Sequence, residues 1–564
     1  MARGSLHLQA ALIAVGCLLA AQGKSDALDN DAQLRVKVEE LRRLAVMQQE
    51  RIEVLKAEAK ELAQFDINAS SKQARRLTAA ELTPSIFAPV FNSTRAYTTA
   101  ENETTALTHQ WIILCGALVM FMQAGFAMVE CGACRAKNVQ NILLKNITDV
   151  CVGTLGWWAF GFCFAYGGDT HDSGDKEGQL KQGGFIGAGY AFGNGMLTTD
   201  EEGKQEPSGQ MLSWFFQWAF CSAASTIVSG GVAERANFAG YSLYSFAMTA
   251  FIYPVVVAWG WGYGWLTFMN DVGISDFAGS GIVHMTGGVG ALVGAIIAGP
   301  RKGRFDPIQG NYDPFAPHSV PLIVLGTFIL WFGWYGFNCG STLAMTGIED
   351  GMRAAQVAMN TTLAAACGGL VTFGVQYYVQ HRYDVPSFCN GILGGLVSIT
   401  AGCNNVECGS ACLIGMFGGL FVALASAILK KCKVDDPIDA FAVHGCCGAW
   451  GVMAAFIFDM GKGLYQVNGA GGGFRCIMAE AGPTGGGTGC RGQNYPIGQL
   501  QFLANLTEVL VILLWVGGLS AMIFAPLKMM NLLRVDDETQ DAGLDQRKHS
   551  PSKAYYIEET GWLD

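Results

Sequence analysis

The chain has 564 residues, of which 51% are hydrophobic and only 15% are charged, and it contains 74 glycines. This composition excludes an ordinary soluble enzyme and is typical of a protein that crosses a membrane several times. The formal net charge of -10 argues against nucleic acid as a partner. The sequence has no nucleophile–base or phosphate-loop motif, so we expect a protein that is not an enzyme and that uses no cofactor.

Residues 1–23 have the layout of a cleavable secretory signal. Arg3 precedes an apolar stretch from Leu8 to Ala20, and small residues follow it. Cleavage there would leave the amino terminus of the mature protein outside the cell. Three N-glycosylation sequons before the first long apolar segment agree with that side of the membrane. Their acceptor residues are Asn68, Asn92 and Asn102.

Residues 24–107 are the expected extracellular extension, and a heptad pattern runs through residues near 34–62. Leu41 and Leu55 stand at one core position of the heptad, and Val38 and Ile52 stand at the other. This spacing predicts a coiled coil. A solitary solvated helix is the alternative. The mixed core residues leave the number of strands and the partner of this segment open.

Residues 108–530 form the expected membrane domain, because long apolar segments follow one another throughout this range. We predict eleven transmembrane helices. They lie near residues 109–131, 147–167, 209–232, 240–264, 277–298, 319–340, 354–379, 386–403, 408–429, 438–458 and 502–527.

Lysine and arginine gather in the first, fifth and ninth connections between these segments, for example at Arg135, Arg301 and Lys430. The positive-inside rule makes the odd-numbered connections cytoplasmic, with the amino terminus outside and residues 531–564 as a cytoplasmic tail. Segments 1–5 and 6–10 then have opposite orientations, which predicts a five-plus-five inverted repeat. We expect a multi-pass protein of the plasma membrane.

His284 and His444 are the only two of the eight histidines that lie well inside apolar segments. Each follows an aspartate by eight residues, Asp276 and Asp436, and each is preceded by valine. An ionisable residue within a membrane span indicates a functional site. Two such rings at similar depth can share a proton and offer polar contacts to a small solute.

Two other interpretations of the histidines remain. Each could be a core residue that is hydrogen-bonded to a neighbouring helix, or the pair could bind a metal. No third ligand accompanies either histidine within its own segment, which disfavours a metal. The eighteen cysteines show no paired CxxC spacing, and only Cys476 and Cys490, in a glycine-rich loop, suggest a disulfide.

Several motifs between about Ala124 and Tyr555 resemble those of the Amt/Rh ammonium transporter family, and the Amt branch in particular. They stand in the family's order. They are AGFAMVECGACRAKNVQNILLKN at 124–146, FFQWAF at 215–220, GGVAERANF at 230–238, DFAGSGIVHMTGG at 276–288, GPRKGRF at 299–305, WFGWYGFNCGS at 331–341, CNGILGGLVSITAGC at 389–403 and DDPIDAFAVHGCCGAWG at 435–451.

The resemblance implies a homotrimer with a narrow apolar pore through each subunit, lined by His284 and His444. It implies an outer site where Trp261 and Ser341 hold an ammonium cation, because indole is the best cation-π face. Phe220 and Phe337 would close the pore below this site. Asp276 would stabilise the cation site or a helix end without touching the solute.

The end of the chain resembles the family's regulatory tail. Arg547 occupies the position of the threonine that is phosphorylated in the plant branch, and Ser550 is a candidate substitute. Near Trp261, Ala258 replaces a histidine that is frequent in the family, so the neighbouring Trp259 is an alternative for the outer site.

Three functions agree with these features. The first is transport of ammonium or ammonia through the pore, which the intact set of histidines and phenylalanines favours. The second is an ammonium sensor that has kept the transporter fold and signals through its tail or its extracellular coiled coil. The third is a gas channel of the Rh type, which the aromatic outer site disfavours.

Overall fold

The computed structural model describes residues 99–168, 183–199, 203–307, 314–460 and 497–555. All of them belong to one compact unit, Pro84–Asp564. The predicted signal peptide and coiled coil lie outside the described residues, as do Asn68, Asn92, Cys476 and Cys490. Asn102 lies in the first turn of the first described helix.

The first half of the membrane domain contains five helical segments, three of which include a π-helical turn. Their elements are α3 (Thr99–Ala133), α4 (Val139–Gly156), η3 (Trp157–Gly161), α5 (Phe162–Tyr166), α6 (Gln210–Gly231), α7 (Phe238–Ala247), η5 (Met248–Ile252), α8 (Tyr253–Gly260), η7 (Ser280–Met285) and α9 (Thr286–Ala298). Short 3-10 turns accompany them: η2 (Ala136–Asn138), η4 (Ala191–Gly193) and η6 (Met269–Asp271).

The second half contains the remaining long helices and two shorter ones. Its elements are α10 (Val320–Gly340), α11 (Ile348–Gln380), α12 (Val385–Thr400), α13 (Cys408–Lys431), η8 (Phe441–Cys446), α14 (Cys447–Ile457) and α16 (Ile497–Met529). The chain ends in α17 (Asp537–Ala542) and α18 (Leu544–Lys548).

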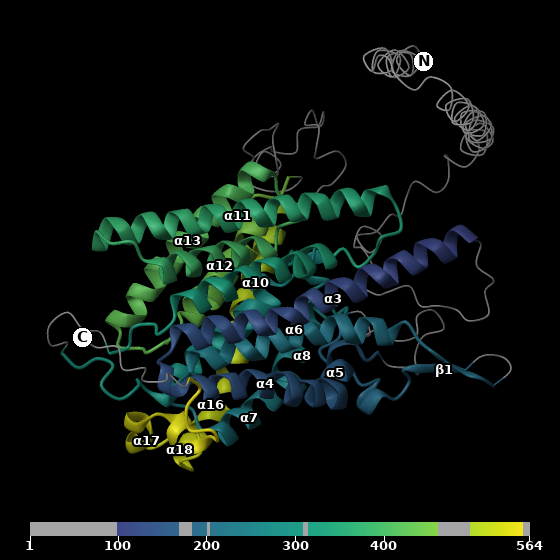
Figure 1. The fold of residues 1–564 in the computed structure, drawn as a ribbon. Coiled ribbons are helices and arrows are strands. Elements are labelled where there is room, and N and C mark those ends of the chain that lie inside the picture. The colour runs from purple at the N-terminus through teal and green to yellow at the C-terminus, as the bar shows by residue number, and fades with distance from the viewer. Residues whose placement is uncertain (1–98, 169–182, 200–202, 308–313, 461–496, 556–564) are drawn as a thin grey trace, which may run out of the picture. The chain divides into compact units, whose positions relative to one another are not determined.

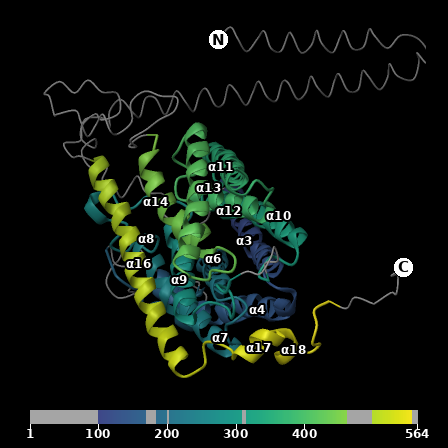
Figure 2. The same cartoon turned by 90° about the vertical axis from the view of Figure 1, so that its left-hand side faces the viewer.

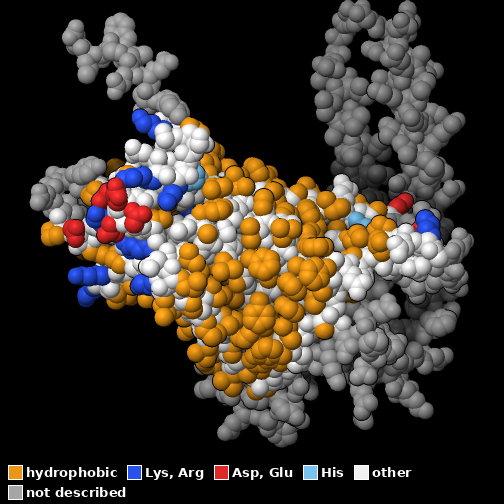
Figure 3. Space-filling model, turned by 90° about the horizontal axis from the view of Figure 1, so that it is seen from below, with side chains coloured by type: hydrophobic (Ala, Val, Ile, Leu, Met, Phe, Trp, Pro, Cys, Tyr) orange, Lys and Arg blue, Asp and Glu red, His pale blue; other side chains and the backbone are white. Residues whose placement is uncertain are grey.

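Nine of the described helices are long and apolar enough to cross a membrane, and Val385–Thr400 and Phe441–Ile457 are shorter apolar helices. Each predicted apolar segment coincides with one of these eleven. The helices lie side by side in one bundle (Figures 1 and 2). In Figure 3 apolar side chains cover the middle of the visible face, and most of its charged side chains gather at one end. The described residues therefore form a multi-pass membrane protein.

Apart from isolated β-bridges, the described part contains one element of β-structure, a two-stranded hairpin of β1 (Leu197–Thr199) and β2 (Gln205–Pro207). The helix boundaries also differ from those expected. α4 begins at Val139, where the sequence predicted a start near 147, because several polar side chains of its first turns are buried. In the sequence these polar residues interrupt the apolar segment, so the predicted start fell after them, although their side chains are buried in the protein. α3 begins ten residues earlier than expected.

The segments that carry the two histidines cross each other at glycines. A Cβ atom on Gly288 would lie 2.1 Å from the backbone nitrogen of Gly445, and a Cβ on Gly448 would lie 2.5 Å from the carbonyl oxygen of Ser280. Only glycine permits this approach, because small residues let helix backbones touch where lipid gives no hydrophobic drive to associate. The crossing brings the turn around His284 against the turn around His444.

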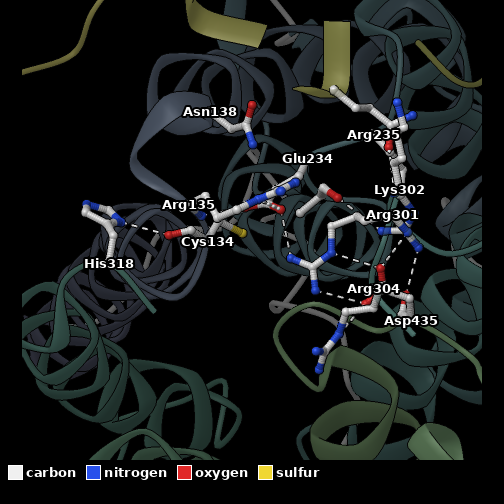
Figure 4. Close-up of polar contacts among 12 residues, drawn as sticks. Cys134, Arg135, Asn138, Glu234, Arg235, Arg301, Lys302, Arg304, His318 and Asp435 are labelled. Carbon is white, nitrogen blue, oxygen red and sulfur yellow. Dashed lines mark hydrogen bonds and ion pairs between the residues drawn. The ribbon is translucent and has the colours of Figure 1, made fainter. Parts of the chain in front are cut away.

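A buried ionic network joins four connections at the end of the bundle where α17 and α18 lie, which we call the tail end. Arg301 donates from Nε and Nη2 to the two oxygens of Asp435 at 2.8 and 2.9 Å, and from Nη1 to Glu234 at 2.8 Å. Arg135 also donates to Glu234 (Figure 4). The Arg135, Arg301 and Arg304 guanidiniums lie 4.5, 4.9 and 5.3 Å from the centre of the Phe315 ring.

This network keeps its carboxylates charged. Burial alone would raise the pKa of Asp435, but the hydrogen bonds and charge of Arg301 outweigh burial and lower that pKa to about 2. The charges of Arg301 and Arg135 likewise outweigh burial at Glu234 and lower its pKa. Because these pKa values are below their ordinary range, the stabilisation is present at neutral pH and is lost as acid protonates the carboxylates.

We expect Gly288→Ala to destabilise the membrane domain by about 1–3 kcal/mol, because the added methyl overlaps the backbone of Gly445 and forces the helices apart. Thermal unfolding in detergent measures the effect. Gly518→Ala on α16 is the matched control, since a Cβ there meets nothing within 4 Å. Equal melting temperatures for the two variants would contradict the close crossing.

We expect Arg301→Met to lower the free energy of unfolding by about 3–5 kcal/mol, since it leaves two buried carboxylates without their shared partner. Arg304→Met should cost much less, because Arg304 is partly exposed and lies 3.5 Å from Asp435. The same unfolding assay compares the two variants at neutral pH. Similar losses of stability would show that Arg301 does not hold the network together.

Candidate functional site

His284 and His444 meet in the interior of the bundle. Their Nδ1 atoms lie 3.3 Å apart, their ring centres are 5.3 Å apart, and both side chains are buried. Two ring nitrogens at this distance form a hydrogen bond only when one carries a proton and the other does not. A hydrogen bond between the two rings therefore requires that one proton lies between the two Nδ1 atoms.

Each histidine lies in a π-helical turn, His284 in η7 and His444 in η8. Such turns are rare and occur frequently at functional sites. Asp276 begins the first turn: its carboxylate accepts hydrogen bonds of 2.8–3.0 Å from the backbone N–H groups of four residues. These are Gly279, Ser280, Gly281 and Ile282.

The second aspartate caps its turn less completely. One oxygen of Asp436 accepts from the Phe441 N–H at 2.8 Å, while its Oδ1 has no hydrogen-bond partner among the described residues. Both turns are therefore π-helical and capped by an aspartate, but the two aspartates accept different numbers of hydrogen bonds. The cap on the His284 turn is the stronger of the two.

Aromatic rings form a series of contacts that begins at His284. The His284 and Phe337 rings lie 5.2 Å apart, and the Phe337 and Phe220 rings stack with 4.0 Å between their centres. Trp261 meets Phe220 edge-on at 6.0 Å. The structure thus arranges Trp261, Phe220, Phe337 and the histidine pair in one sequence of contacts, although they come from five helical segments.

Trp261 is fixed by the segment that begins the His284 turn, because its indole N–H donates to the Asp276 carbonyl at 2.9 Å. Trp259, the alternative residue for the outer site, packs instead against Trp515 and Trp265. Ser341 lies one turn after Phe337 on the same chain segment, and its hydroxyl donates to the Phe337 carbonyl at 2.9 Å.

Sequence reasoning missed two aromatic neighbours of the pair. The Trp334 ring stacks on His284 with 4.9 Å between the ring centres, and the Phe126 ring lies 5.9 Å from that of His444. Both lie in motifs quoted above, Phe126 in residues 124–146 and Trp334 in residues 331–341. Their spacing carries no signal that separates them from ordinary core aromatics.

Sequence reasoning also missed four buried charged residues, Glu130, Lys145, Asp149 and Glu508. Three of them stand inside predicted spans. The rule that drew attention to the histidines, that an ionisable group in a span indicates a site, would have found them. Within the described ranges, no group of three or more His, Cys, Asp or Glu side chains is arranged to hold a metal ion.

Comparison with known proteins adds an independent result. A family model described as the Ammonium Transporter Family matches residues 110–555. The ammonium transporter Amt2 of Archaeoglobus fulgidus is 38% identical over 463 residues, covering 81% of this chain and 90% of the archaeal protein. Ammonium transporter 1 member 1 of Arabidopsis thaliana is 37% identical over 447 residues, covering 77% and 82% of the two chains.

Two solved structures share the fold. One, named as a sensor Amt protein, has a TM-score of 0.66 at 32% identity and covers 79% of this chain and 99% of that protein. The crystal structure of Saccharomyces cerevisiae Mep2 has a TM-score of 0.61 at 26% identity and covers 83% and 95%. The chain therefore belongs to the ammonium transporter family and is a multi-pass ammonium transporter.

Proposed function

We propose that ammonium crosses this protein through an apolar pore in each subunit, and that the pair of His284 and His444 carries or shares its proton. The distance of 3.3 Å between the two Nδ1 atoms is the observation that supports this most directly. A neutral pair with one donor and one acceptor can hydrogen-bond ammonia without presenting a fixed charge.

Trp261 is the proposed outer binding site, together with Ser341. An ammonium ion over the indole face is attracted by the ring, by about 0.5–2 kcal/mol. The hydrogen bond from the indole N–H to the Asp276 carbonyl fixes the orientation of that face. Asp276 supports this site without touching the ion, because its carboxylate already accepts hydrogen bonds from four backbone N–H groups of the His284 turn.

Phe220 and Phe337 are the proposed gate. Both rings are buried, and they stack with 4.0 Å between their centres, so a solute can pass only if the rings move. A hydrated ion would lose its water at this point. Because a cation is costly in an apolar passage, the ion must release its proton or transfer it to the histidines.

The remaining features of the proposal concern the whole chain. We propose that all eleven helices cross the plasma membrane as an inverted five-plus-five repeat, and that three copies form a homotrimer. The meeting of the first, third, fifth and ninth connections at the tail end agrees with alternating helix direction. The signal peptide, the glycans, the extracellular coiled coil and the Cys476–Cys490 disulfide remain predictions.

An ammonium sensor that retains the transporter fold is the second candidate function. The similarity of the fold to that of a protein named as a sensor Amt protein supports this candidate. The tail is positioned to transmit a signal or to receive one, because Asp541 contacts Lys302 and Asp545 contacts the backbone at Gln140. Ser550, the candidate for phosphorylation, is exposed.

We predict that His284→Ala and His444→Ala each lose transport, or lose discrimination against potassium, while the protein still reaches the membrane. The physical reason is that the remaining imidazole loses its hydrogen-bond partner and the polar path is broken. Currents carried by ammonium and by potassium, recorded in a host that lacks its own ammonium transporters, measure the discrimination.

Trp261→Leu is the contrasting variant in the same recordings. It should weaken the apparent affinity for ammonium by about 0.5–2 kcal/mol and leave discrimination largely intact, because it removes only the outer cation-π contact.

If either histidine variant keeps the wild-type current ratio for ammonium over potassium, both residues are ordinary core histidines. An ammonium response without any flux in the wild type would favour the sensor.

A further inference from the structure

The helix α16 carries a row of buried polar side chains that has no role in the mechanism above. Gln501, Asn505 and Glu508 are all buried, although the helix around them is mainly apolar. Their spacing of four and three residues places them on one face of the helix. α16 packs against the His284 turn and against the 3-10 turn that precedes it in the chain, η6.

Two members of the row bind the backbone of the segment that leads into the His284 turn. Gln501 Nε2 donates to the Gly273 carbonyl at 2.8 Å. Asn505 Oδ1 accepts from the Ser275 N–H at 3.0 Å. These two hydrogen bonds tie α16 to the chain immediately before Asp276, the residue that begins the turn.

Glu508, the third member, reaches the turn itself. Its Oε1 lies against the backbone of Gly281, where an added Cβ would be 2.5 Å from this oxygen. The Gly281 N–H donates to Asp276 Oδ2 at 3.0 Å, and the side chains of Glu508 and Asp276 are hydrogen-bonded to each other. Carboxyl groups can form such a bond only if one of them carries a proton.

The surroundings of the two carboxyl groups decide which of them is protonated. Asp276 accepts hydrogen bonds from four backbone N–H groups, and such donors favour the ionised form. Neither oxygen of Glu508 accepts a hydrogen bond from the described residues, and none of their Lys or Arg side chains pairs with it. An ionised Glu508 would be a buried charge without compensation, next to a second negative charge. The proton therefore belongs on Glu508.

Asp276 links Glu508 to both parts of the proposed pore. Its carboxylate holds the backbone of the turn that carries His284, and its carbonyl oxygen accepts from the Trp261 indole N–H at 2.9 Å. A side chain that fixes Asp276 therefore acts on the proposed cation site and on the histidine pair at the same time.

We propose that Glu508 is a positioning residue for ammonium transport: as a protonated acid it donates a hydrogen bond to the Asp276 carboxylate and so fixes Trp261 and the His284 turn against α16. Glu508 keeps its proton while ammonium passes, so it takes no part in proton transfer. The inference rests on the proposed function of Trp261 and the histidine pair. The protonation of Glu508 is a property of the resting protein and is measured without transport.

Infrared spectroscopy of the full-length protein in lipid vesicles tests the protonation. At neutral pH, the wild-type spectrum minus that of Glu508→Gln should contain the C=O band of a carboxylic acid. Thr507→Val is the matched control on the same helix, because its hydroxyl donates to the Leu503 carbonyl, and its difference spectrum should lack the band. Absence of the acid band in the Glu508→Gln difference would show that Glu508 is ionised and would overturn the proposal.

Uptake of ¹⁵N-ammonium and currents for ammonium and potassium test the positioning role. We expect Glu508→Gln to keep the wild-type KM and discrimination, because the amide can donate the same hydrogen bond. Glu508→Leu should raise the KM and lose discrimination, since leucine cannot donate. Its melting temperature should stay close to that of the wild type, because leucine fills an apolar site and Asp276 keeps its four N–H donors. Thr507→Val should transport like the wild type.

Three results would overturn the positioning role: a raised KM in Glu508→Gln, wild-type transport in Glu508→Leu, or a loss of transport in Glu508→Leu that only follows a fall in its melting temperature. If Glu508→Leu does not reach the membrane, the infrared band and transport by Glu508→Gln decide. Failure of the proposed pore appears separately, as unchanged discrimination in His284→Ala while the acid band of Glu508 is still present.

Discussion

The contact between His284 and His444 depends on how closely two helical segments can approach each other. A side chain on Gly288 or Gly448 would collide with the backbone of the other segment, so glycine at these positions is what allows two imidazole rings to meet at 3.3 Å. Asp276 then fixes the turn around His284 through four backbone hydrogen bonds. The histidine chemistry is therefore a consequence of backbone packing.

A second constraint is that polar groups in a membrane must find partners inside the protein. At the end of the bundle, the tail-end network pairs its buried charges, since Arg301 donates to both Asp435 and Glu234. Around the histidine pair, aromatic rings fill the interior instead, as in the stack of Phe220 on Phe337. The cluster around Glu130 and Lys145 meets it only in part.

The fold could be predicted largely from the apolar segments, because a hydrocarbon environment permits few alternatives to a bundle of helices. The histidines could be found because each is an isolated ionisable residue in an apolar run. The start of α4 and the burial of Lys145 could not, since Asn141, Lys145 and Asp149 look like a solvated face until α3 and α6 are packed against them. Likewise, only the structure places Trp261 beside Phe220 and Trp259 away from it.

The central claim is that the two rings share one proton between their Nδ1 atoms. Nuclear magnetic resonance of the protein with ¹⁵N-labelled histidine tests it directly, and only eight histidines need to be assigned. The account predicts that one Nδ1 of the pair is protonated, that the other is not, and that a scalar coupling connects the two nitrogens across the hydrogen bond. Two rings that both carry their proton on Nε2, without such a coupling, would contradict it.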